Sequence, residues 1–179
     1  MAQALLVIDM HEFLVAGLWD GDGLARRIGG IVERAHLVGV PVLVPHQVGP
    51  QGDLFDPAQD GRGVSPLLGL QEEDRIIPKR ATDAFWETDL DGVLRSLETA
   101  TVVVTGAATD YCVDATVRSA ASHGFDVELV EDGHAPMANG DPAAGLSPAQ
   151  IVAHHNTVLA GAVHPGGTTR LVSAADALR

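Results

Sequence analysis

The stretch from Thr101 to Gly124 constrains the fold more than any other part of the chain. It opens with five β-branched residues, 101–105, which are typical of a strand buried in a parallel sheet. Gly106 ends this run, and apolar residues then recur at helical spacing up to Gly124, a natural C-terminal stop for a helix. The stretch therefore predicts a buried strand, a short turn and a helix over 112–123, with Cys112 at the start of the helix.

The same alternation of strand and helix runs along the whole chain. Further strands are predicted at residues 4–8, 41–44, 75–78, 126–130 and 169–172. Further helices are predicted at 23–36, 90–97, 147–162 and, as a short closing helix, 173–178. Residues 47–69 are rich in Gly, Pro and Asp and predict a long surface excursion, which at this length is usually functional. The pattern predicts an α/β fold whose mainly parallel sheet has about six strands and is covered on both faces.

Length and composition limit the class of protein. A chain of 179 residues with 46% apolar and 20% charged residues is typical of one soluble domain spanning 1–179. No basic and apolar leader or bilayer-length segment is present, and the chain has one cysteine, so we expect a cytoplasmic protein without a membrane partner. A formal charge of −13 argues against a nucleic-acid partner, because phosphates would be repelled.

Three polar residues follow predicted strands and should meet at one edge of the sheet. Asp9 follows strand 4–8, Lys79 follows strand 75–78, and Cys112 lies beyond strand 101–105. Taken singly, the aspartate could form a turn, the lysine could be solvated and the cysteine could be a small buried residue. Together they form a relay in which a carboxylate takes the proton of the thiol, and the helix start and the lysine both favour the thiolate.

Three motifs carry a resemblance to a known family. ALLVIDM at 4–10, KRATDAF at 79–85 with Thr88, and VTGAATDYCVDATVR at 104–118 resemble the isochorismatase-like cysteine hydrolase superfamily, which includes nicotinamidases and N-carbamoylsarcosine amidohydrolase. The resemblance extends from residue 4 to about 162. It implies a three-layer α/β/α fold, a homo-oligomer, and a catalytic triad with an oxyanion hole. Its residues would be Asp9, Lys79 and Cys112 for the triad, and the N–H groups of Ala108 and Cys112, set by a cis peptide at Ala107–Ala108, for the hole.

Two departures from the family pattern bear on the substrate. Nicotinamidases bind a metal through an Asp-x-His pair after the second strand, whereas this chain reads PHQVGPQGDLFDP, with His46 alone. We therefore expect no metal and no cofactor, and nicotinamide becomes a less favoured substrate. His11 stands where the family has glutamine, and it either packs internally or faces the pocket. Phe13, Trp19 and Phe85 are candidate pocket walls, with core packing as the alternative for each.

The sequence leaves three functions open, of which the two enzymatic ones act on a small-molecule substrate. The first is a cysteine amidohydrolase that cleaves a small carboxamide or ureido C–N bond through a thioester. The second is an isochorismatase-type vinyl-ether hydrolase, in which Asp9 acts as general acid and no thiol is needed. The third is a non-catalytic oligomeric binding module. The cysteine within its full motif favours the first.

Overall fold

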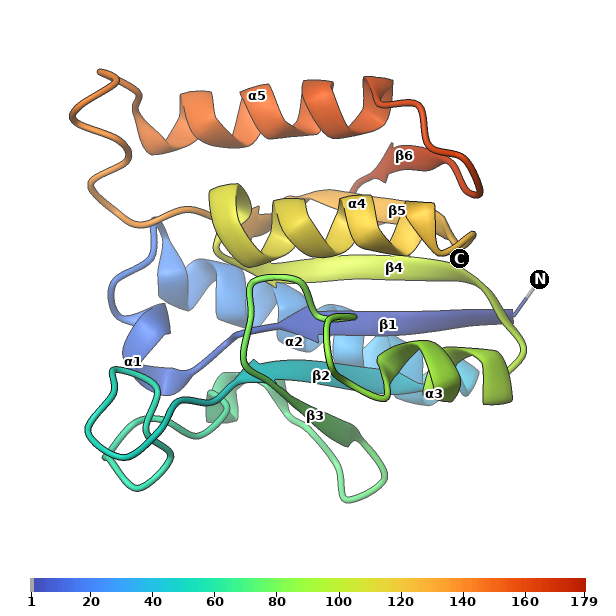
Figure 1. The fold of residues 1–179 in the computed structure, drawn as a ribbon, viewed down its shortest axis with the longest axis horizontal. Coiled ribbons are helices and arrows are strands. Elements are labelled where there is room, and N and C mark those ends of the chain that lie inside the picture. Colours follow the sequence, from blue (N-terminus) through green and yellow to red (C-terminus); the bar gives the residue numbers. More distant parts are fainter. Residues whose placement is uncertain (1) are drawn as a thin grey trace.

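A computed structural model describes residues 2–179 and has one six-stranded sheet in the order β3-β2-β1-β4-β5-β6. All five neighbouring pairs are parallel, as Figure 1 shows. The strands are β1 (Ala2–Ile8), β2 (Val42–Gln47), β3 (Arg75–Lys79), β4 (Thr99–Ala107), β5 (Asp126–Ala135) and β6 (Thr169–Val172). The predicted parallel sheet of about six strands is confirmed.

Helices cover both faces of the sheet. They are α1 (Glu12–Val15), α2 (Gly21–Val38), α3 (Leu90–Ser96), α4 (Asp114–Ser122) and α5 (Pro148–Gly161), with a 3₁₀ turn η1 (Pro66–Leu68) and a π turn η2 (Thr109–Val113). In Figure 1, α2 lies behind the sheet and α3 and α4 lie in front, with α5 alongside β5 and β6. The three-layer α/β/α arrangement follows. Within residues 2–179, no helix has both the length and the apolar character needed to cross a membrane.

The strands are apolar on both sides because each face has its own core. Leu5 and Val7 of β1 pack into the cluster beneath α2, together with Ile28. Leu6 and Ile8 point the other way and pack with Val117 of α4. This alternation explains why β1 and β4 appear in the sequence as continuous apolar runs, which is what burial on both faces produces.

Three predicted elements have different limits in the structure. β2 continues through Pro45 and His46 to Gln47, which the sequence assigned to the excursion. β5 runs ten residues instead of five, because a register shift between Val104 and Gly106 lets it pair again with the end of β4. The segment predicted as a helix from Cys112 begins instead as the π turn, and α4 starts two residues later.

The predicted closing helix over 173–178 is wrong. These residues form one turn, in which Ala177 N–H donates to the Ser173 carbonyl at 2.9 Å. The Arg34 guanidinium donates hydrogen bonds to the carbonyls of Ala174 and Ala177. Leu178 adopts a left-handed conformation with φ 63°. The turn therefore cannot propagate, because its carbonyls are already engaged and its last residues leave the helical region.

Candidate active site

The candidate site lies where the strand order reverses. β1 has β2 on one side and β4 on the other, so the connections after β1 and β4 diverge at their carboxyl ends. In parallel α/β sheets this switch point is the usual place for a ligand. Asp9 follows β1 directly, and the turn that carries Cys112 follows β4.

Asp9 is held by the ends of its neighbouring strands. Its backbone is left-handed, with φ 49°, a conformation that aspartate tolerates better than most residues. Its N–H donates to the Pro45 carbonyl at 3.0 Å, and its Oδ1 accepts from the Gln47 N–H at 2.7 Å. Only 2% of the residue is exposed. The carboxylate is therefore fixed in position, with Oδ2 directed at Lys79.

Lys79 joins the carboxylate to the thiol. It is the last residue of β3 and is 1% exposed. Its Nζ lies 2.7 Å from Asp9 Oδ2 and donates to Cys112 Sγ at 3.3 Å. It also donates to Gln47 Oε1 at 2.8 Å and to the Ala81 carbonyl at 2.9 Å. A buried ammonium needs such partners, and here they bring the three residues singled out from the sequence into contact.

Cys112 lies in the π turn rather than at the first residue of an α-helix. The Val113 N–H donates to the Ala108 carbonyl at 3.2 Å, a contact that spans five residues. π turns of this kind are frequent at functional sites. The peptide bond between Ala107 and Ala108 is cis, as the family resemblance implied. Cys112 is half-buried, so its sulfur faces the site while its flank packs on the core cluster under α4.

The expectation that this position favours the thiolate is wrong for the resting protein. Burial, followed by the negative charge of Asp9, raises the pKa of the Cys112 thiol to about 12, and the Lys79 ammonium offsets only part of this rise. The thiol is therefore protonated near neutral pH. In this environment the sulfur needs a base that removes its proton as the reaction proceeds.

Sequence reasoning missed Gln47. Its N–H bonds Asp9, its Oε1 accepts from Lys79, and its carbonyl lies 2.9 Å from His11 Nε2. The strand was predicted over 41–44, the apolar run, whereas β2 continues to Gln47. The apolar run could not reveal that a polar residue three positions later closes the site.

His11 packs inside the protein. It is fully buried, its Nδ1 lies 3.2 Å from the Asp9 carbonyl, and its ring stacks on His46 with centroids 3.8 Å apart. His46 in turn contacts the Arg62 carbonyl through Nε2 at 2.8 Å. Burial and the neighbouring His11 lower the pKa of His46. Within residues 2–179, no three His, Cys, Asp or Glu side chains are grouped so that they could hold a metal ion.

The aromatic candidates occupy three different places. The guanidinium carbon of Arg62 lies 4.0 Å from the centroid of the Phe13 ring. The Phe13 ring also packs beside Phe55 of the excursion. Trp19 is 40% exposed, and its backbone N–H donates to the Pro136 carbonyl beyond β5. Phe85 packs in the core under α4, stacked on His123 and Phe125, so its assignment as a pocket wall is wrong. Its segment folds inward because Ala84 N–H bonds the Thr116 hydroxyl of α4.

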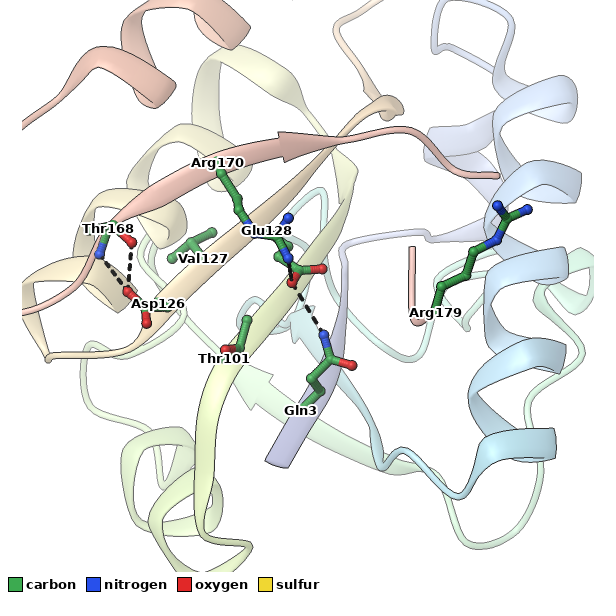
Figure 2. A pocket seen from close by; sticks show the side chains of 8 residues that line it. All are labelled: Gln3, Thr101, Asp126, Val127, Glu128, Thr168, Arg170 and Arg179. Atoms are coloured by element: carbon green, nitrogen blue, oxygen red, sulfur yellow. Dashed lines mark hydrogen bonds and ion pairs between the residues drawn. The ribbon is translucent and has the colours of Figure 1, made fainter. Parts of the chain in front are cut away.

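Two hollows flank the carboxyl edge, and a third lies elsewhere. A hollow of about 190 Å³ is lined by Val48, Pro78 and Arg80, the sequence neighbours of Gln47 and Lys79, and by Trp86 and Glu87. Another, of about 560 Å³, includes Phe13 and Ser65. The polar hollow in Figure 2 lies at the opposite edge, where the strands begin, and its Glu128 pairs with Arg170 and with Gln3. Its Asp126 accepts from Thr168 and its Arg179 pairs with Asp176, so these charged groups already have partners.

Comparison with known proteins identifies relatives of this chain. The Isochorismatase domain family model matches residues 3–159. The chain is 30% identical to the isochorismatase family protein YddQ of Bacillus subtilis (strain 168) over 138 residues, covering 74% of this chain and 77% of that protein. It is 30% identical to a streptothricin hydrolase of Streptomyces noursei over 137 residues, 74% of this chain but 54% of that protein. A ureidoacrylate amidohydrolase of Klebsiella pneumoniae is 44% identical over 51 residues, 28% of this chain and 22% of that protein.

The fold has solved counterparts as well. The crystal structure of an isochorismatase from Pseudomonas putida KT2440 superposes with a TM-score of 0.86 at 26% identity, covering 97% of this chain and 88% of that one. Because the family model spans most of the chain and the fold agrees over nearly all of it, the chain belongs to the isochorismatase family.

Proposed function

We propose that this isochorismatase-family hydrolase is a cysteine-dependent amidohydrolase. It cleaves the C–N bond of a small carboxamide or ureido compound through a thioester on Cys112. The observation that carries the proposal is the buried Lys79 ammonium, which lies 2.7 Å from Asp9 Oδ2 and 3.3 Å from Cys112 Sγ. A cation in contact with both an acid–base group and a nucleophile is an arrangement suited to acyl transfer through sulfur.

The first half of the reaction forms the thioester. Asp9 accepts the thiol proton as Cys112 Sγ attacks the substrate carbonyl carbon, which offsets the high resting pKa of the thiol. The Lys79 ammonium balances the negative charge that the sulfur and the carboxylate share. The N–H groups of Ala108 and Cys112 hold the oxyanion. The C–N bond then breaks, and Asp9 gives its proton to the departing nitrogen, which leaves as ammonia or an amine.

The second half uses the same groups to release the acid. With the leaving group gone, Asp9 removes a proton from a water molecule, and the oxygen of that water attacks the thioester carbonyl. The C–S bond breaks, the carboxylic or carbamic acid departs, and the proton returns to the sulfur. The carboxylate thus serves alternately as base and acid, so one fixed residue is sufficient.

The relatives support C–N chemistry over the alternatives. The name of the ureidoacrylate amidohydrolase from Klebsiella pneumoniae denotes amide-type cleavage of a ureido compound. The streptothricin hydrolase, whose name also denotes hydrolysis, matches a longer part of this chain than the ureidoacrylate amidohydrolase does. A vinyl-ether hydrolase would leave the contact between Lys79 and the Cys112 sulfur without a role.

The test is a screen of small carboxamides and ureido acids for ammonia release, with wild type and Cys112→Ala side by side. We expect turnover by wild type that falls at least about 10³-fold in the alanine variant, because the nucleophile is lost. Adding a chelator should leave the wild-type rate unchanged. Retention of most turnover by Cys112→Ala would refute the thioester route and favour the ether-hydrolase alternative.

A further inference from the structure

A row of hydrogen-bonded side chains runs from α5 to the turn that carries Cys112. Thr109 is the first residue of the π turn, and its Oγ1 lies 2.9 Å from His134 Nδ1. His134 Nε2 lies 2.9 Å from Asn156 Oδ1 of α5. Thr109 is fully buried and His134 is 3% exposed. None of the three has a role in the chemistry described above.

The donor and the acceptor of each hydrogen bond can be assigned by starting from Asn156. Asn156 Nδ2 donates to the Glu131 carbonyl at 3.0 Å, so its Oδ1 is the atom that faces His134 and accepts. His134 therefore carries its proton on Nε2, and its Nδ1 is left to accept from the Thr109 hydroxyl. Burial lowers the pKa of His134 to about 4, which keeps the ring neutral and this arrangement intact at neutral pH. Both ring nitrogens of His134 are thus hydrogen-bonded.

The fixed hydroxyl lies one residue beyond the proposed oxyanion donor. Gly106 and Ala107 pair with His134 and Ala135 in the β4–β5 ladder, so the His134 backbone is anchored beside the cis peptide. The Ala108 carbonyl accepts from the N–H groups of both Tyr111 and Val113, at 3.1 and 3.2 Å. The side-chain bond to Thr109 fixes the other side of the same peptide unit. The turn is thus held from the backbone and from α5 together.

We infer that His134 and Asn156 are positioning residues, which act through Thr109 to aim the Ala108 N–H at the oxyanion. The inference rests on the proposed function, because of the three functions considered only the amidohydrolase passes through a tetrahedral oxyanion on Cys112. This inference gives α5 a role in catalysis, although its residues are distant from Cys112 in the sequence. A displacement of about 1 Å at a reacting group can cost about 100-fold in rate. We expect a loss of roughly 10- to 100-fold in kcat when this chain of hydrogen bonds is broken.

The experiment compares Thr109→Val and Asn156→Ala with the conservative Thr109→Ser. Matched controls are Thr157→Val and His154→Ala, two exposed positions on α5. Six quantities are measured: kcat and KM on the best amide from the screen, inhibition by the corresponding aldehyde, alkylation of Cys112 by iodoacetamide, hydrogen exchange of the peptide covering 105–113, and the temperature of unfolding. The aldehyde forms a tetrahedral adduct that uses the oxyanion hole, whereas alkylation needs only the thiol.

The inference predicts a specific split between these quantities. Thr109→Val and Asn156→Ala lose kcat and aldehyde affinity by similar factors and exchange faster over 105–113, while KM and the alkylation rate stay within about twofold. Thr109→Ser and both controls behave like wild type. Wild-type kcat in Thr109→Val, or a parallel loss of kcat, alkylation and thermal stability, overturns the positioning role. If Cys112→Ala turns over as fast as wild type, the proposed function has failed instead.

Discussion

At the scale of single residues, the reactivity of the site depends on how burial and charge act on Asp9, Lys79 and Cys112. The lysine is paired with the carboxylate and donates to the sulfur, while burial and the carboxylate keep the thiol protonated. Asp9 therefore has two opposed effects. Its charge suppresses the resting thiolate, yet it is the group that removes the thiol proton during the reaction.

This opposition gives a prediction for Asp9→Asn. Because the negative charge of Asp9 raises the pKa of Cys112, its removal should lower that pKa and speed alkylation by iodoacetamide at pH 8, about tenfold for each pKa unit. Amide turnover should fall by about 10²–10⁴-fold, because the proton acceptor is gone. Alkylation kinetics and ammonia release measure the two effects on the same preparation.

Asp176→Asn is the control for this experiment. Asp176 lies in an exposed pair with Arg179, so both rates should remain at their wild-type values. A variant at Asp9 in which alkylation and turnover fall together would contradict the assignment of Asp9 as the base and indicate a collapsed site.

At the scale of elements, the site depends on how closely β4 approaches β1 at the switch point. Gly106 has φ +125°, and a Cβ at this position would lie 2.2 Å from the Ile8 carbonyl oxygen. Neither the conformation nor the space admits a side chain. The glycine thus lets the end of β4 pass against the residue that precedes Asp9.

Gly106→Ala should therefore destabilise the protein and inactivate it. We expect a loss of about 2–4 kcal/mol in the free energy of unfolding, since a β-carbon here needs the two central strands to separate. Gly30→Ala is the matched control: Gly30 lies within α2, with open space around it, and its replacement should stabilise by about 0.5–1 kcal/mol. Urea unfolding of both variants measures the difference. Equal stability of Gly106→Ala and wild type would refute the close approach.

Local patterns predicted the elements well where a single period dominates. The strands of the sheet and the capped helix α5, where Ser147 and Gln150 form a capping box, follow directly from the residues. Pairing with a neighbour decides the limits that were missed. β5 extends to Ala135 only because β4 lies beside it, and the turn over 173–178 ends where Arg34 takes its carbonyls.

At the scale of the whole molecule, a buried neutral histidine makes folding depend on pH. Burial lowers the pKa of His134 from 6.5 to about 4. The unfolded chain therefore binds a proton that the folded protein does not between these two values. The stability linked to His134 is fully present above pH 6.5, is lost as the pH falls toward 4, and changes no further below that.

We predict that this residue alone lowers the free energy of unfolding by about 3 kcal/mol between pH 6.5 and 4. His134→Gln should unfold more easily at pH 7 but show a flatter dependence over this range, because glutamine does not titrate. His154→Gln, at an exposed position, should retain the wild-type slope. Urea unfolding at half-unit steps of pH measures the slopes, and an unchanged slope in His134→Gln would contradict the prediction.

The candidate site could be predicted only in part from the sequence, because some of its contacts form only in the assembled fold. Asp9, Lys79 and Cys112 each lie at or just beyond the carboxyl end of a strand, so topology alone brings them to one edge. Gln47, His134 and Asn156 contact partners 22 to 32 residues away through side chains that no local period marks. The high pKa of the thiol likewise depends on burial by the assembled core, which spacing in the sequence does not show.

The most direct test of the central claim is to trap the thioester. Wild type and Cys112→Ala are mixed with the best amide, quenched in acid within the first turnovers, and analysed by intact mass and then by peptide mass. The account predicts that wild type gains the mass of the acyl group on the peptide containing Cys112, and that the alanine variant gains nothing and is inactive. Steady turnover without any adduct, undiminished in Cys112→Ala, would contradict it.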